Sequence, residues 1–188
     1  MIAKTFEGDR LNLHVPGKED YRFIHECVNT QDHRRMMTTS EPIEYEKSRS
    51  IRQMIANMLS RRLEMKKEGL LLIAEADGER VGVCGLQSID YQNSHANIFV
   101  CVREGLESLG YGYEMNKEII NFGFNELGLN KIKAGHRRDN ENSKTMAEEV
   151  GLERKCIREQ ECYVDGEYRD IVMYEILREE WDRSQEKI

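Results

Sequence analysis

Between residues 96 and 114 the chain passes from a strand pattern directly into a helix that begins with two glycines. Residues 96–102 read as a strand, and Gly110-Tyr-Gly112 stands where a helical pattern starts. Glycine lets the backbone approach a ligand closely and adopt conformations closed to other residues. The first turn of a helix offers free N–H groups and the positive end of the dipole. The segment therefore predicts a site for an anion such as a pyrophosphate, the alternative being a tight turn with two convenient glycines.

Other glycine and serine motifs do not fit the chain. The dinucleotide fingerprint needs a third glycine soon after the first two, and that glycine is missing. A P-loop needs Gly-Lys-Ser or Gly-Lys-Thr, and neither occurs. The Gly-x-Ser-x-Gly elbow that would supply a nucleophilic serine is also absent.

The order of the surrounding patterns predicts a mixed sheet. Three strands in quick succession predict an antiparallel meander, with a hairpin turn at Asp77-Gly78. The strand–helix–strand unit at residues 96–136 predicts two parallel strands in the same sheet. The expected fold class is α/β (α+β), with helices on the faces of a mixed, mostly antiparallel sheet. We expect strands at 11–15, 70–76, 80–90, 96–102, 131–136, 152–164 and 168–177, and helices at 18–29, 48–67, 110–127 and 143–150.

Length and charge narrow the class of protein. The 188 residues fit one domain, which we place at residues 1–181, followed by a charged tail at 182–188. The formal net charge of −7 argues against a nucleic-acid partner. It is compatible with a cationic substrate such as an amine, although such a charge also serves solubility alone. No apolar run is long enough to cross a bilayer, and the N-terminus lacks a signal-peptide pattern. We therefore expect a cytoplasmic protein with no membrane partner.

The cysteines predict neither a disulfide framework nor a metal site. Their number is odd and no pair has the Cys-x-x-Cys spacing, so reduced thiols and no bound metal are expected. They are Cys27, Cys84, Cys101, Cys156 and Cys162.

Several motifs, in order and at matching spacing, resemble one family. Glu107-Ser-Leu-Gly-Tyr-Gly112 resembles a pyrophosphate loop of the form Gln/Arg-x-x-Gly-x-Gly/Ala, except at its first position. Residues 121–132 resemble the helix and strand that follow it, and Asn140-Glu-Asn-Ser143 with residues 148–152 resembles the next motif. Residues 163–170 and 177–181 resemble a closing hairpin. On these pieces residues 81–181 resemble the GNAT superfamily of N-acetyltransferases, and more narrowly its RimJ/RimL-like branch. Residues 9–14 match only loosely.

The resemblance implies a sheet that splays near its middle and holds acetyl-CoA, as a co-substrate, in the gap. The pantetheine arm would pair with the backbone of the third meander strand, and main-chain N–H groups of the loop would hold the pyrophosphate. An asparagine and a serine would lie near the thioester. The implied cofactor-binding residues are Phe99, Val100, Cys101, Val102, Ser108, Leu109, Gly110, Tyr111, Gly112, Tyr113, Asn140 and Ser143.

Ser143 is the candidate donor near the leaving sulfur, directly or through water. The alternative is that Ser143 caps a helix at 144–150, a position that serine prefers. Many superfamily members have a tyrosine acid four residues further on, where this chain has Ala147. Asn97 stands where relatives often have a glutamate, and Glu107 would repel phosphate unless its side chain points away.

The general base stays open at this point. Glu161 lies close to where the branch places an acidic residue, although the register is one residue off. The other candidates are Asp170, His25, His33, His95 and His136.

The function that we expect is direct attack of a primary amine on the thioester of acetyl-CoA. Positioning of the two partners alone supplies several kcal/mol of the barrier. The acceptor is a protein N-terminus, a polyamine or a small amine metabolite, with a cationic acceptor mildly favoured by the net charge. The alternative is a degenerate domain that binds coenzyme A or a protein partner without turnover. The resemblance also implies a possible homodimer.

Overall fold

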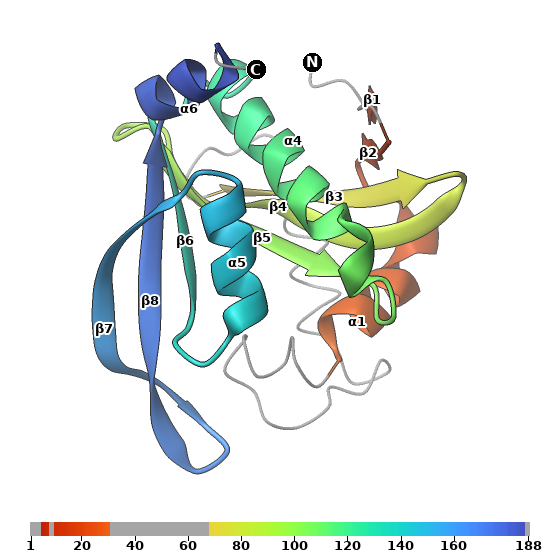
Figure 1. Cartoon of the computed structure of the whole chain (residues 1–188). Helices are drawn as coiled ribbons and strands as arrows, with labels where there is room; N and C mark the ends of the chain where they lie inside the picture. The colour runs from red at the N-terminus through yellow and green to blue at the C-terminus, as the bar shows by residue number, and fades with distance from the viewer. Residues whose placement is uncertain (1–4, 8–9, 31–67, 187–188) are drawn as a thin grey trace.

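The computed structural model describes residues 5–7, 10–30 and 68–186 as one sheet with helices packed against it (Figure 1). Within these ranges the sheet has eight strands in the order β1-β2-β3-β4-β5-β6-β8-β7. Its strands are β1 (Thr5–Glu7), β2 (Asn12–His14), β3 (Glu68–Ala76), β4 (Glu79–Asp90), β5 (His95–Val102), β6 (Lys131–Arg137), β7 (Glu153–Val164) and β8 (Glu167–Leu177). Its helices are η1 (Lys18–Asp20), α1 (Tyr21–Val28), η2 (Glu107–Leu109), α4 (Tyr111–Asn125), α5 (Glu141–Glu149) and α6 (Arg178–Gln185).

Turn chemistry sets the antiparallel meander of β3, β4 and β5. Asp77 and Gly78 join β3 to β4 with positive φ angles of 50° and 78°. Two such residues form the hairpin turn whose twist matches the flanking strands. The predicted meander is therefore confirmed, and the predicted hairpin turn lies where the sequence placed it.

Alternate residues of β3 supply two hydrophobic clusters, one on each face of the sheet. Leu72 and Ala74 belong to the larger cluster, which includes Met115 and Ile119 of α4. Leu71 and Ile73 belong to the smaller cluster, together with Ile24 and Cys27 of α1. Because side chains of a strand alternate between faces, α4 covers one face and α1 covers the other.

The sheet opens between β5 and β6. These strands are parallel, as predicted, but pair only from His95 with Lys131 to Asn97 with Lys133. Residues 98–102 of β5 continue without a partner on that side among the described residues. The splay implied by the family resemblance is therefore confirmed, and it leaves backbone groups of β5 free to pair with a ligand.

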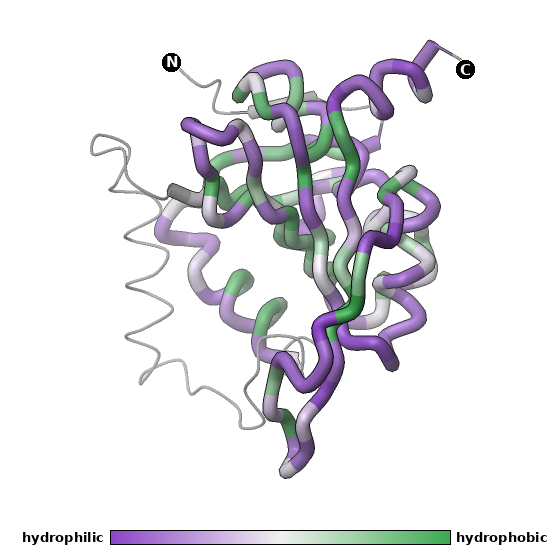
Figure 2. The backbone as a smooth tube through the Cα atoms, turned by 90° about the vertical axis from the view of Figure 1, so that its left-hand side faces the viewer, coloured by the Kyte–Doolittle hydropathy of each residue, from purple (hydrophilic) through white to green (hydrophobic). Residues whose placement is uncertain are grey.

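Helix α6 occupies part of the charged segment 182–188 that the sequence predicts to follow the domain. Only 4 % of the Trp181 side chain is exposed, and its ring centroid lies 6.4 Å from that of the buried Phe124. The backbone N–H of Leu177 donates to Glu180 Oε2 at 2.8 Å, which caps the start of α6. Figure 2 shows why the pattern hid this helix, because α6, beside the C-terminus, is hydrophilic along most of its length.

Replacing Trp181 tests whether α6 is part of the fold. We expect Trp181→Ala to lower the free energy of unfolding by about 3–5 kcal/mol, since a large buried aromatic side chain is deleted. The measurement is unfolding in denaturant, monitored by circular dichroism. Arg183→Ala is the control on the same helix, because its exposed side chain should contribute under about 0.5 kcal/mol. A Trp181→Ala variant as stable as the wild type would show that α6 does not pack as described.

The other predicted elements lie within a few residues of their observed bounds, and β1 is an addition. The predicted helix at 48–67 lies outside the described residues. The division into a domain at 1–181 and a tail stays a prediction. Within residues 5–7, 10–30 and 68–186, no helix is long and apolar enough to span a membrane.

Candidate active site

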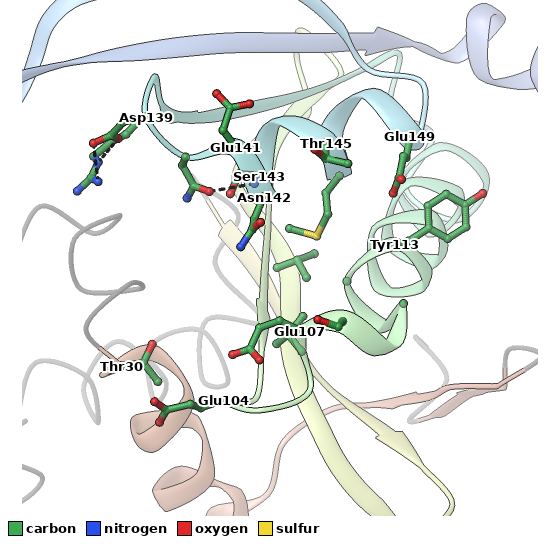
Figure 3. Close-up of a pocket in the computed structure, with 18 residues that line it drawn as sticks. Thr30, Glu104, Glu107, Tyr113, Asp139, Glu141, Asn142, Ser143, Thr145 and Glu149 are labelled. Carbon is green, nitrogen blue, oxygen red and sulfur yellow. Dashed lines mark hydrogen bonds and ion pairs between the residues drawn. The ribbon is translucent and has the colours of Figure 1, made fainter.

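A pocket of about 730 Å³ opens at the splay of the sheet (Figure 3). Val100 and Val102 of β5 line it. The loop before α4 lines one wall, and the β6–α5 connection with the first turns of α5 lines another. The pocket therefore meets the free edge of β5 and the N-termini of two helices.

The first helix N-terminus follows the glycine loop. Gly110 has a φ of +85°, a left-handed conformation that glycine adopts without the steric cost of a side chain. Among the described residues, no acceptor pairs with the backbone N–H groups of residues 110–113. Gly110 and Gly112 both line the pocket. Free donors and a helix dipole of this kind suit a phosphate group, and the predicted phosphate site stays a prediction.

Gly112 lets α5 approach α4 closely. A Cβ at this position would collide with Met146 Sδ, because the Met146 side chain packs directly against the glycine. Asn116 is buried on the next turn of α4, and its Nδ2 donates to the Gly112 carbonyl at 2.8 Å. The absence of a side chain at residue 112 thus allows the two helices to pack closely at the pocket wall.

The second helix N-terminus is that of α5, and its cap differs from the predicted one. Asn140 is the N-cap, and its Oδ1 accepts from the backbone N–H of Ser143 at 3.0 Å. The suggestion that Ser143 caps this helix is therefore wrong, because the helix starts at Glu141 and places Ser143 inside its first turn. No described residue hydrogen-bonds to the Ser143 hydroxyl, and Ser143 lines the pocket. The structure thus brings Asn140 and Ser143 together beside the loop.

The four predicted residues of β5 divide between the two faces. Val100 and Val102 line the pocket, whereas Phe99 packs with the α1 cluster. Cys101 Sγ donates to the Cys27 carbonyl at 3.1 Å, also on the α1 side. Burial raises the pKa of the Cys101 thiol well above its usual value, so this residue is a poor nucleophile. Any contact of Phe99 and Cys101 with a ligand in the pocket would go through their backbone.

Of the other loop residues predicted from the resemblance, two line the pocket and two do not. Ser108 and Tyr113 line it. Leu109 is 52 % exposed, and the ring of Tyr111 faces the guanidinium of Arg10.

Five carboxylates line the pocket among the described residues, and the loop motif in the sequence pointed to Glu107 alone. Glu107 faces into it, so the sequence-based condition that this side chain points away is not met. The others are Glu104, Asp139, Glu141 and Glu149. Asp139 and Glu141 flank the Asn140 motif, which was the signal available in the sequence. The part of the pocket lining that the structure describes is therefore acidic.

Arg137 is the one lysine or arginine among the described residues that line the pocket. Its Nε and Nη2 donate to the two oxygens of Asp139 at 2.8 and 3.0 Å. The hydrogen bonds from Arg137 lower the pKa of Asp139, which makes this carboxylate a weak proton acceptor.

The predicted base candidates do not meet at this site. Glu161 is exposed on β7, pairs with Arg158 at 2.9 Å and does not line the pocket. Asp170 accepts from the backbone N–H of Gln160 at 3.0 Å, also outside the lining. His136 is buried, with its ring stacked on Tyr174 at 5.2 Å between centroids.

The remaining histidines do not line the pocket where the structure describes them. His25 is buried in α1. His95 Nε2 lies 3.8 Å from Asp90 Oδ2. Neither histidine lines the pocket. His33 lies outside the described residues. Within the described part of the chain, no group of three or more His, Cys, Asp or Glu side chains could hold a metal ion.

Comparison with known proteins identifies the family to which the chain belongs. Residues 10–153 match the family "Acetyltransferase (GNAT) domain". The chain belongs to the GNAT acetyltransferase family. The predicted N-acetyltransferase class is confirmed at that level, and the RimJ/RimL-like branch stays a prediction.

Relatives and solved structures agree with the GNAT assignment. "Putative ribosomal N-acetyltransferase YdaF" of Bacillus subtilis (strain 168) is 28% identical over 106 residues, which cover 56% of this chain and 58% of that protein. "Uncharacterized N-acetyltransferase p20" of Bacillus licheniformis is 24% identical over 95% of this chain and 98% of that one. A spermidine N-acetyltransferase from Vibrio cholerae, solved with CoA and spermine, superposes with a TM-score of 0.81 at 17% identity. It covers 93% of this chain and 99% of that one. At that identity the superposition supports the fold.

Proposed function

We propose that this GNAT chain transfers an acetyl group from acetyl-CoA to a primary amino group that is neutral when it attacks, on an acceptor that carries positive charge elsewhere, with a polyamine as the preferred acceptor class. The observation that carries the proposal is the acidic pocket that joins the free edge of β5 to two helix N-termini. The helix N-termini suit an anionic cofactor, and the carboxylates suit a cationic acceptor.

The residues of the pocket fit acetyl-CoA, whose thioester supplies an activated acetyl group when it is bound. The free N–H groups of residues 110–113 would hold phosphate oxygens. The unpaired edge at residues 98–102 would pair with the amide groups of the pantetheine arm. Val100 and Val102 would exclude water from that arm.

Two kinds of side chain would serve the transfer. The Ser143 hydroxyl would donate a proton or a hydrogen bond to the departing sulfur, because it lines the pocket and has no described partner. Carboxylates at the mouth would bind the charged parts of the acceptor. Figure 3 shows Glu104 and Glu107 near one another at one side of the pocket, so that a cationic acceptor beside them would meet both carboxylates.

The acceptor class rests on charge and on the relatives. A polyamine carries several positive charges, which suits a lining with five carboxylates. Two of them already have a basic partner, because Asp139 pairs with Arg137 and Glu141 pairs with Lys144. A protein N-terminus is the second candidate, favoured by the printed name of YdaF.

An acceptor panel tests the proposal. The chain is incubated with acetyl-CoA and spermidine, a basic peptide with a free N-terminus, or a simple monoamine, and released thiol is measured. We expect transfer to spermidine with the highest kcat/KM. Glu104→Gln should raise the KM for spermidine about fivefold and change the KM for the monoamine less, since one favourable charge contact is lost. Glu179→Gln, an exposed carboxylate of α6, is the charge-matched control.

Preference for the peptide would overturn the polyamine assignment. Absence of transfer to all three acceptors, with coenzyme A still bound, would instead support the degenerate domain that binds without turnover.

A further inference from the structure

The described lining of the pocket offers no unpaired lysine or arginine to a phosphate group at the loop 107–112. Glu104 and Glu107 lie beside the loop, and both would repel phosphate groups. Arg137 is held by two hydrogen bonds to Asp139. The helix N-terminus alone would therefore have to offset two carboxylates.

A cation from the N-terminal part of the chain lies against this loop from outside. The Arg10 guanidinium carbon lies 5.5 Å from the centroid of the Tyr111 ring. Arg10 Nη1 lies 3.9 Å from the position that a Cβ on Gly110 would occupy, and it pairs with Glu114 Oε1. Tyr111, Gly110 and Glu114 all belong to the loop or the first turns of α4.

The backbone on which Arg10 sits is fixed, whereas its side chain is accessible. The neighbouring Leu11 is 1 % exposed and packs in the larger core cluster. The Arg10 side chain is 57 % exposed. An exposed ion pair such as that with Glu114 contributes little to stability, so the guanidinium is free to exchange one oxygen partner for another.

We propose that Arg10 is a cofactor-binding residue whose guanidinium contacts phosphate oxygens of coenzyme A at the loop 107–112. The inference rests on the proposed function, because it assumes that this loop holds the cofactor. Arg10 supplies from a distant part of the sequence the positive charge that position 107 does not provide. Glu114 and the Tyr111 ring hold the guanidinium beside the loop until phosphate arrives, which reduces the ordering cost of binding. Arginine suits this role because its planar fork matches phosphate oxygens.

Equilibrium binding of coenzyme A to the whole chain tests the proposal by titration calorimetry. We expect Arg10→Gln to weaken binding about tenfold and to make the dissociation constant less dependent on salt concentration, since one charge-assisted contact is lost. Arg10→Lys should retain part of the affinity. Arg22→Gln is the matched control, because Arg22 is also an exposed arginine, paired with Glu26 at 3.0 Å on α1.

A second ligand, dephospho-CoA, shows which phosphate is bound. A tenfold loss that persists with dephospho-CoA assigns Arg10 to the pyrophosphate, and a loss that disappears assigns it to the 3′-phosphate. Both results support the proposal. An Arg10→Gln variant that binds coenzyme A as tightly as the wild type would overturn it, and so would a weakening equal to that of Arg22→Gln. A wild-type chain that binds no coenzyme A would overturn the proposed function itself.

Discussion

Gly110→Val is expected to weaken coenzyme A binding at least about a hundredfold. The φ angle of +85° at residue 110 is strongly disfavoured for a β-branched residue, so the loop must change its path. The free N–H groups of residues 110–113 would then no longer converge, and two lost charge-assisted hydrogen bonds account for a factor of that size. The measurement is the dissociation constant for coenzyme A, with the thermal midpoint measured on the same samples.

Gly166→Val is the matched control for backbone strain. Gly166 also has a φ of +85°, but it lies in the turn between β7 and β8, outside the pocket lining. Both substitutions should lower the free energy of unfolding by about 1–2 kcal/mol, and only Gly110→Val should lose the ligand. If both variants bind coenzyme A equally well, the loop is not the phosphate site.

Ser143→Ala is expected to lower kcat about a hundredfold and to leave the KM for acetyl-CoA nearly unchanged. A donor to the leaving sulfur acts in the transition state more than in the bound substrate complex. Because Asn140 provides the cap through the Ser143 backbone N–H, the hydroxyl is not needed for the helix. The free energy of unfolding should therefore change by less than about 0.5 kcal/mol.

Ser184→Ala separates this effect from the general loss of a hydroxyl. The Ser184 hydroxyl donates to the Trp181 carbonyl at 2.6 Å in α6, and its removal should leave kcat unaltered. Equal kcat values for Ser143→Ala and the wild type would remove Ser143 from the chemistry. The proton would then reach the sulfur from water or from another group.

Local signals in the sequence were enough to predict the sheet. The Asp77-Gly78 turn and the strand–helix–strand unit each depend on neighbouring residues, so the meander and the parallel pair β5–β6 were both predictable. The glycine loop was predictable for the same reason, because the left-handed φ of Gly110 is a local requirement.

The features that sequence reasoning missed depend on contacts between distant residues. Arg10 and Glu114 are 104 positions apart, so no local pattern connects them. Helix α6 has Trp181 as its one buried residue, which is too little for a periodic signal. The start of α5 was misplaced because Ser143 and Asn140 are both good capping residues, and only the backbone geometry decides between them.

The acidic lining of the pocket was also hidden, because its members come from separate segments. Glu104 and Glu107 precede α4, whereas Asp139 and Glu141 precede or begin α5. These carboxylates gather at one pocket because the sheet splays between β5 and β6, and the extent of that splay cannot be read from the sequence.

Titration calorimetry of the wild-type chain with coenzyme A shows directly whether the pocket holds the cofactor. We expect one binding site per chain, and competition for it when acetyl-CoA is already present. The same addition should raise the thermal midpoint as the ligand concentration passes the dissociation constant. No heat of binding and no rise of the midpoint at millimolar coenzyme A would contradict the assignment of the pocket at residues 107–113 to the cofactor.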